Sequence, residues 1–193
     1  SQGLILFNHD EKTLTESSQK DDNTIAIFLN EDLKRNSEKK LLKTTKAIFE
    51  PGEYEVNNIP IQSHAIKLNT ENLDESTNIY SVISEGLTIC YLNEISKISI
   101  PAGVTESIGK IDILICISND SSDQSVESIN ALLSSLDPKV LIIAEKDSKQ
   151  DTTEIYEKLI KGLGQSFEDS ILNANITKSG ISDALKVLNL RKS

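Results

Sequence analysis

The sequence contains no methionine, only two cysteines and only two histidines among its 193 residues. Cys90 and Cys116 both lie inside strand-length apolar runs, where a free thiol behaves as a small apolar side chain. We therefore expect both in the core, and we expect neither a disulfide framework nor a cysteine-based zinc site. The lack of methionine indicates that the printed chain is processed or is part of something longer.

Long hydrophobic runs and several catalytic motifs are also missing. The longest apolar runs, residues 111–117 and 140–144, have the length of strands, far below the ~20 residues of a membrane-spanning helix. The start of the chain lacks the basic and apolar segments of a signal peptide. Glycine-rich nucleotide-binding loops and the Gly-x-Ser-x-Gly nucleophile motif are absent as well. We therefore expect a cytoplasmic protein without a membrane partner.

The sequence has fewer basic than acidic residues, 20 against 30, which gives a formal net charge of −10. This balance argues against binding to a nucleic-acid backbone, which depends on neutralising phosphates. The one basic cluster comprises Lys39, Lys40, Lys43 and Lys46. Such a cluster favours a solvated helix face over a phosphate site.

The early part of the chain is punctuated by turn residues. Pro51-Gly52 predicts a turn between two strands, and Asn57-Asn58 predicts a turn before a third strand. That third strand carries His64 at its expected end. Further strands are predicted at 4–7 and 24–29, and a short amphipathic helix at 30–43.

The later part of the chain predicts a sheet with helices outside it. Residues 79–84 and 87–92 read as a hairpin closed by Glu85-Gly86. Residues 111–144 read as a strand, a helix over 121–136 and a parallel strand. A short strand at 96–100 and a helix at 152–163 complete the predicted elements. With 37% hydrophobic and 26% charged residues, the chain predicts one α/β layered domain over 1–193.

Three stretches in the same order resemble the metallo-β-lactamase fold, and within it the zinc-dependent hydrolases similar to ascorbate-6-phosphate lactonase. The stretches are residues 49–64, residues 78–94, and residues 111–117 with 137–145. The resemblance runs from about Leu4 to the C-terminus. It implies an αββα sandwich, truncated at its N-terminus by one or two strands, and a closing pair of strands within 175–190.

The family's chemistry depends on two metal ions bridged by a hydroxide, which is the nucleophile because bound metal lowers the pKa of water. Its ligand signature, His-x-His-x-Asp-His, follows the second core strand. The resemblance gives those four positions to Asn30, Asp32, Lys34 and Arg35. Lys and Arg have no lone pair to donate, and their charge repels a metal ion. The resemblance thus implies that the dinuclear zinc site is lost, and we expect no cofactor.

Three further positions of the family's pocket hold residues with two interpretations each. The resemblance places His64 at the family's third-strand histidine, Glu94 at the bridging aspartate and Glu145 at the last histidine. His64 is either a metal ligand or a hydrogen-bonded strand residue. Glu94 and Glu145 either act in catalysis or pair with Lys34 and Arg35, and we hypothesise the ion pair.

Two functions are compatible with this pocket. In the first, the chain is a non-catalytic binding or structural subunit that forms a homo-oligomer or pairs with a related subunit, because an edge left by missing strands invites pairing. In the second, it is a lactonase- or phosphoesterase-like hydrolase. One Zn²⁺ or Mn²⁺ would then be held by the remaining donors, which are Asp32, His64, Glu94 and Glu145.

Overall fold

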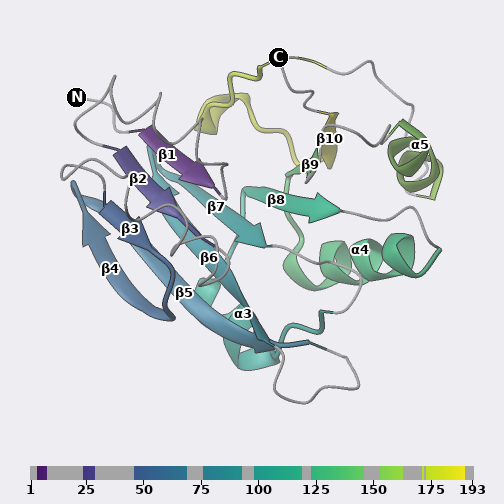
Figure 1. The fold of residues 1–193 in the computed structure, drawn as a ribbon. Coiled ribbons are helices and arrows are strands. Elements are labelled where there is room, and N and C mark those ends of the chain that lie inside the picture. The colour runs from purple at the N-terminus through teal and green to yellow at the C-terminus, as the bar shows by residue number, and fades with distance from the viewer. Residues whose placement is uncertain are drawn as a thin grey trace.

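Two β-sheets and a layer of helices make up the described part of this computed structural model (Figure 1). The structure describes residues 4–7, 24–28, 46–68, 76–92, 98–118, 123–145, 153–162, 171 and 173–189. The predicted helix at 30–43 lies outside these residues. Among the helices that are described, none combines the length and the apolar character of a membrane span.

The smaller sheet has three parallel strands in the order β1-β2-β3, which are Leu4–Phe7, Thr24–Ile27 and Lys46–Ile48. The sequence predicted the first two. All four residues of β2 are buried, as its nearly continuous apolar sequence indicated. Ile25 and Ile27 pack against the larger sheet, and Ala26 belongs to a separate buried cluster with Leu6 and Phe28.

The larger sheet has seven strands in the order β10-β9-β8-β7-β6-β5-β4. Strands β4 to β7 form an antiparallel meander, and β7 to β10 are parallel. The strand bounds are β4 Gly52–Val56, β5 Ile59–Lys67, β6 Ser76–Ser84, β7 Leu87–Leu92, β8 Ile113–Ser118, β9 Val140–Glu145 and β10 Lys186–Asn189.

Two of the predicted turns have the backbone that a tight hairpin requires. Asn57 and Asn58 have φ of 54° and 61°, and Glu85 and Gly86 have φ of 51° and 75°. Positive φ at both central residues matches the right-handed twist of the flanking strands. Both hairpin predictions are therefore confirmed.

The predicted strand-helix-strand unit is also confirmed. Helix α4, Asp123–Leu136, connects β8 to β9, and these two strands are parallel. Helix α5, Thr153–Gly162, follows as expected. Buried residues of α3 (Ala102–Ile108), α4 and α5 pack on one face of the larger sheet, which we call the helix face.

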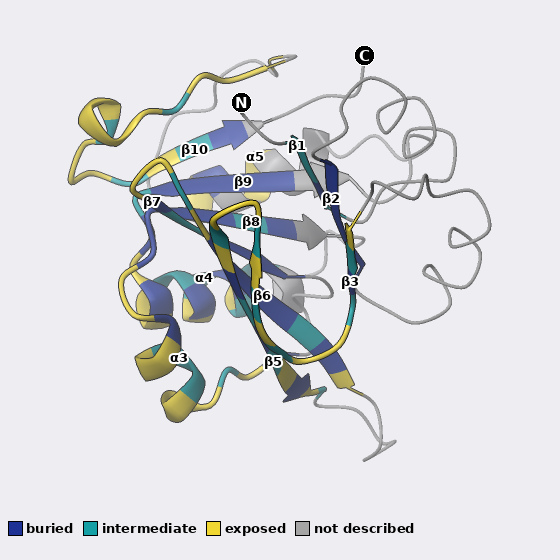
Figure 2. Cartoon of the chain, turned by 90° about the vertical axis from the view of Figure 1, so that its left-hand side faces the viewer, coloured by how far each residue is buried: buried dark blue, intermediate teal, exposed yellow. Residues whose placement is uncertain are grey.

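The opposite face of the larger sheet, which we call the inner face, is covered by two separate pieces of chain. The three-stranded sheet packs over its β4 to β7 end, with Ile25 and Ile48 against Tyr80 and Val82. At the β8 to β10 end, the cover comes from the C-terminal segment through Ile176 and Ile181. Figure 2 shows the mostly buried central strands between these layers.

Several sequence predictions differ from the structure. Pro51-Gly52 does mark a break, but β3 and β4 on either side of it belong to different sheets and are not paired. Helix α3 was not predicted, because Ile108 is its one buried residue and leaves no apolar period to detect. The described part of the expected 96–100 strand forms only a bridge from Ile98 to Leu68.

The predicted pair of closing strands within 175–190 is wrong. The structure has a short 3₁₀ helix, η2 (Lys178–Gly180), followed by the single strand β10. Strand β10 adds to the sheet in parallel beside β9, so its partner is not a neighbour in sequence. The preference for a strand over a helix at this end is confirmed for Lys186–Asn189.

Candidate functional site

Several strands end at one edge of the larger sheet, which we call the C-edge. Strands β7, β8, β9 and β10 are parallel, and β5 runs in the same direction because β6 is antiparallel to both β5 and β7. Their carboxyl ends therefore meet along the C-edge. Loops after strand ends are where folds of this kind place functional side chains.

The ends of the smaller sheet are fixed to the same edge by hydrogen bonds that are buried or partly buried. The Tyr80 hydroxyl donates to the Phe28 carbonyl at 2.7 Å, just after β2. The Asn78 side-chain amide donates to the Phe49 carbonyl at 2.7 Å, just after β3, and to the Tyr80 oxygen at 3.3 Å. The start of β6 lies at the C-edge, with Asn78 in its first half and Tyr80 at its centre. The chain beyond β2 therefore leaves from this edge.

Burial sets the chemistry of Tyr80. Its side chain is fully buried, and this burial raises the pKa of the phenol although the hydrogen bond with Asn78 opposes the shift. The hydroxyl is therefore a neutral donor that holds the strand end, which makes it a structural group. The sequence offered no signal for this role, since Tyr80 and Phe28 are 52 positions apart.

Five of the predicted pocket residues lie outside the described residues, and these are Asn30, Asp32, Lys34, Arg35 and Glu94. The backbone of Glu145 is described as the last residue of β9, paired with Ser118 of β8. Strands β2 and β7, which precede the other five residues, end at the C-edge, and so does β9. The contacts between the side chains of these six residues are not described, so the hypothesised ion pairs stay predictions.

His64 lies inside β5, with Ala65, Ile66 and Lys67 following it in the same strand, so its expected position at a strand end is wrong. It pairs with Ile79 of β6. Ile66 and Ile79 both belong to the cluster under the helices, and side chains two apart in a strand share a face. His64 therefore points to the helix face, away from the three-stranded sheet.

One ring nitrogen of His64, Nε2, is buried without a hydrogen bond to any described residue. The histidine side chain is on the other side of the larger sheet from Tyr80, which faces the end of β2. The described geometry therefore does not bring His64 together with the segment that follows β2.

The described residues do not fit a pair of metal ions. Among them, no group of three or more His, Cys, Asp or Glu side chains is close enough to hold one. The thiols of Cys90 and Cys116 are fully buried as predicted, and burial raises the pKa of both.

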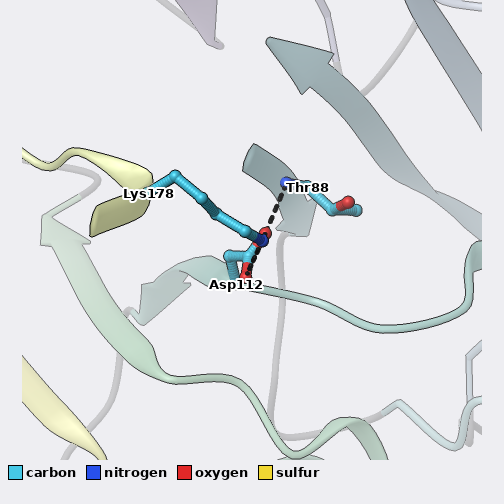
Figure 3. A network of polar contacts seen from close by, with 3 residues as sticks. All are labelled: Thr88, Asp112 and Lys178. Atoms are coloured by element: carbon cyan, nitrogen blue, oxygen red, sulfur yellow. Dashed lines mark hydrogen bonds and ion pairs between the residues drawn. The ribbon is translucent and has the colours of Figure 1, made fainter. Parts of the chain in front are cut away.

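One charged network was not expected from the sequence. Figure 3 shows Lys178 of η2 and the backbone N–H of Thr88 converging on the carboxylate of Asp112. The Lys178 ammonium lies 2.7 Å from both carboxylate oxygens, and Thr88 donates to Oδ2 at 2.9 Å. The Asp112 side chain is only 6% exposed. This network ties η2 to the start of β7 and to the residue just before β8, and the two charged residues are 66 positions apart in the sequence.

Comparisons with known proteins identify the fold. A family model described as the beta-lactamase superfamily domain matches residues 5–144. A comparison with curated proteins finds no significant match.

Solved structures of similar fold come from several bacteria. One from Thermotoga maritima, provisionally described as a Zn-dependent hydrolase of the metallo-beta-lactamase superfamily, is 16% identical with a TM-score of 0.57, and the match covers 86% of this chain and 80% of that one. One from Parabacteroides distasonis, provisionally described as a metal-dependent hydrolase, is 17% identical with a TM-score of 0.55, covering 99% and 79%. The metallo-beta-lactamase fold protein YhfI from Bacillus subtilis is 12% identical with a TM-score of 0.53, covering 98% and 75%.

These matches confirm the predicted fold and correct one prediction. The α/β architecture of metallo-β-lactamase type is confirmed. The expectation of no cofactor is wrong for this fold, because two of the similar structures are described as Zn-dependent or metal-dependent hydrolases. At these identities the structural likeness itself shows the fold alone.

Proposed function

Because the chain belongs to the beta-lactamase superfamily, we propose that it is a member whose dinuclear metal site is lost and that it serves as a non-catalytic binding or structural subunit. The observation that carries the proposal is the pair of cations, Lys34 and Arg35, at positions that the resemblance gives to metal ligands. Neither side chain can donate a lone pair to a metal ion.

The described geometry supports this proposal in two ways. The end of β2 is held at the C-edge by Tyr80, so the segment with Lys34 and Arg35 starts there. His64, one of only two histidines in the chain, faces the helices instead. The C-edge therefore has few of the neutral imidazoles that a zinc pair requires.

A hydrolysis assay tests the proposal. The wild-type protein, supplied with Zn²⁺ or Mn²⁺, is expected to cleave neither a bis(4-nitrophenyl) phosphate diester nor a simple lactone above background. The matched control restores the family signature with four changes, Asn30→His, Asp32→His, Lys34→Asp and Arg35→His. Turnover by the wild type that disappears in Glu94→Gln and Glu145→Gln would contradict a non-catalytic role.

A second candidate is a metal-dependent hydrolase with one metal ion, and the descriptions of the similar structures favour it. Its donors would come from Asp32, Glu94 and Glu145, since His64 points to the helix face. This function predicts one equivalent of bound Zn²⁺ or Mn²⁺ by elemental analysis after dialysis. It also predicts loss of both metal and turnover in Glu94→Gln, whereas a protein that keeps its metal in that variant excludes this site.

We also propose that the chain forms a homo-oligomer or pairs with a related subunit. Strand β1 is an edge of the three-stranded sheet and pairs with β2 alone among the described strands. An unpaired edge offers its N–H and C=O groups to another chain. Light scattering at micromolar concentration is expected to give a dimer or larger species, and a monodisperse monomer would count against this proposal.

A further inference from the structure

A cavity of about 230 Å³ lies at the end of the larger sheet opposite to the C-edge. Its lining includes Val140 and Lys186, which are the first residues of β9 and β10, and Ile176 and Ile181 from the C-terminal segment. Glu145 is at the other end of β9, roughly 17 Å away at the usual rise along a strand. The cavity is therefore separate from the site of the proposed function.

The floor of the cavity is apolar. Val140 and Leu188 are buried residues of the inner face, and Ile176 and Ile181 pack against them from the covering segment. An engineered apolar cavity of about 150 Å³ in another protein holds benzene. The larger volume here therefore suits a compact ligand somewhat bigger than benzene.

Two lysines, Lys139 and Lys186, stand in the cavity lining, in a protein with a formal net charge of −10. Lys186 is exposed and forms no ion pair within the described part of the chain. Lys139 has a mostly buried side chain, and its ammonium lies 3.0 Å from Asp137, whose side chain is 84% exposed. An ion pair with so exposed a partner is weak. The Lys186 ammonium can therefore be engaged by an anion, and Lys139 adds a second positive charge to the same lining.

The wall of the cavity is held in place before any ligand arrives. Thr177, just before η2, and Gly180, its last residue, both line the cavity. Helix η2 is anchored by Lys178 to the nearly buried carboxylate of Asp112. The Lys186 N–H also donates to the Lys139 carbonyl at 2.9 Å, which fixes the two lysines relative to each other. A preformed site avoids part of the ordering cost of binding.

We propose that this cavity binds a small carboxylic acid with an apolar body. The carboxylate lies between Lys139 and Lys186, and the hydrocarbon part covers Val140 and Leu188. Ligand sites commonly combine an apolar lining with a few polar groups that fix the orientation. The proposal does not depend on whether the C-edge holds a metal ion.

Binding of benzoate and hexanoate to the full chain tests the proposal, with isothermal titration and amide NMR shifts as readouts. We expect binding at millimolar concentration or better, with shifts centred on residues 139–140, 174–182 and 186–188. Benzamide, the neutral isostere of benzoate, is expected to bind at least roughly tenfold more weakly, as is benzoate to Lys186→Met. Equal affinity for benzoate and benzamide, or no binding of either acid, would overturn the proposal.

Two further variants separate a real site from a general charge effect. Lys67→Met removes an exposed lysine from the C-edge end of β5, several strands away from β9 and β10, and is expected to bind benzoate as tightly as the wild type. Ala174→Phe places a ring in the cavity from an exposed position and is expected to abolish binding with an unchanged melting temperature. Inorganic phosphate that binds as tightly as benzoate would exclude a role for the apolar floor.

Discussion

Tyr80 and Tyr91 are paired across β6 and β7, and both are almost completely buried on the inner face. Only the Tyr80 hydroxyl has a partner, the Phe28 carbonyl at 2.7 Å. The Tyr91 hydroxyl has none among the described residues, although its ring packs 4.5 Å from that of Phe7. The Tyr80 hydroxyl therefore stabilises the contact between the two sheets, whereas the Tyr91 hydroxyl is buried without a hydrogen bond to any described residue.

Removing each hydroxyl should thus have opposite consequences. Tyr80→Phe leaves a buried carbonyl without a donor and should lower the free energy of unfolding by about 1–3 kcal/mol. Tyr91→Phe removes an unpaired polar group and should be neutral or stabilising. Urea denaturation followed by circular dichroism measures both. Tyr54→Phe is the control, because its hydroxyl bonds to Glu50 at an exposed site. A larger loss in Tyr91→Phe than in Tyr80→Phe would refute this assignment.

The Asp112–Lys178 pair makes stability depend on pH. Burial acts to raise the pKa of the Asp112 carboxyl, but hydrogen bonds from Lys178 and Thr88 and the charges of Lys178 and Lys110 hold it below its usual value. Because the pKa is lower in the folded than in the unfolded protein, the pair stabilises the fold above the unfolded value of about 3.9. That stabilisation disappears as the pH falls through the folded pKa.

Asp112→Asn is therefore expected to lower the free energy of unfolding by about 1–2 kcal/mol near neutral pH. This value lies in the lower part of the range for hydrogen bonds to charged groups, because the Lys178 side chain is 55% exposed to solvent. The difference from wild type should persist down to about pH 5 and shrink below about pH 4. Urea denaturation at several pH values measures it. Asp183→Asn, at an exposed position, should show no such change. A difference that is constant at all pH values would argue against the ion pair.

At the scale of elements, sequence patterns correctly predicted the helices, strands and turns whose formation depends on residues close together in the sequence. The hairpin turns at 57–58 and 85–86, the amphipathic helices α4 and α5 and the apolar strands β8 and β9 all carry local signals. What the patterns missed depends on distant partners. Strand β10 forms by pairing with the open edge of β9. Strands β3 and β4 belong to different sheets because β3 pairs with β2 and β4 pairs with β5.

The candidate site shows the same division. The resemblance assigned the ligand signature to residues 30–35 after β2, and two further pocket positions to Glu94 after β7 and Glu145 in β9. Strands β2, β7 and β9 do end at one edge of the larger sheet. The orientation of His64 was not predicted, because it depends on which residues of β5 the register places under the helices. The Asp112–Lys178 pair lies beyond any local pattern.

Two glycines allow a matched test of these elements. Gly86 has φ of +75° at the β6–β7 hairpin, whereas Gly103 lies in helix α3 without a positive φ, and no atom lies within 4 Å of a Cβ at either position. Gly86→Ala is expected to lose about 1–2 kcal/mol from backbone strain. Gly103→Ala is expected to gain up to about 1 kcal/mol from helix propensity. Thermal denaturation compares them, and a gain in both would disprove the left-handed turn.

At the scale of the whole molecule, Cys90 and Cys116 report on global opening. Both are 0% exposed in the cluster under the helices, and burial raises the pKa of each thiol. A thiol reagent such as Ellman's reagent should therefore react with the native protein at least about 10³-fold more slowly than with the unfolded chain. Rapid reaction of either thiol under native conditions would show that this core opens locally.

The divided cover of the inner face has a consequence for how the protein is made. The ribosome releases β7, β8 and β9 well before Ile176 and Ile181. During synthesis, the sheet therefore presents a bare stripe of aliphatic side chains until the last part of the polypeptide emerges. Nascent chains with such exposed surface tend to aggregate and to engage chaperones. Truncation before residue 176 should accordingly send the protein into inclusion bodies.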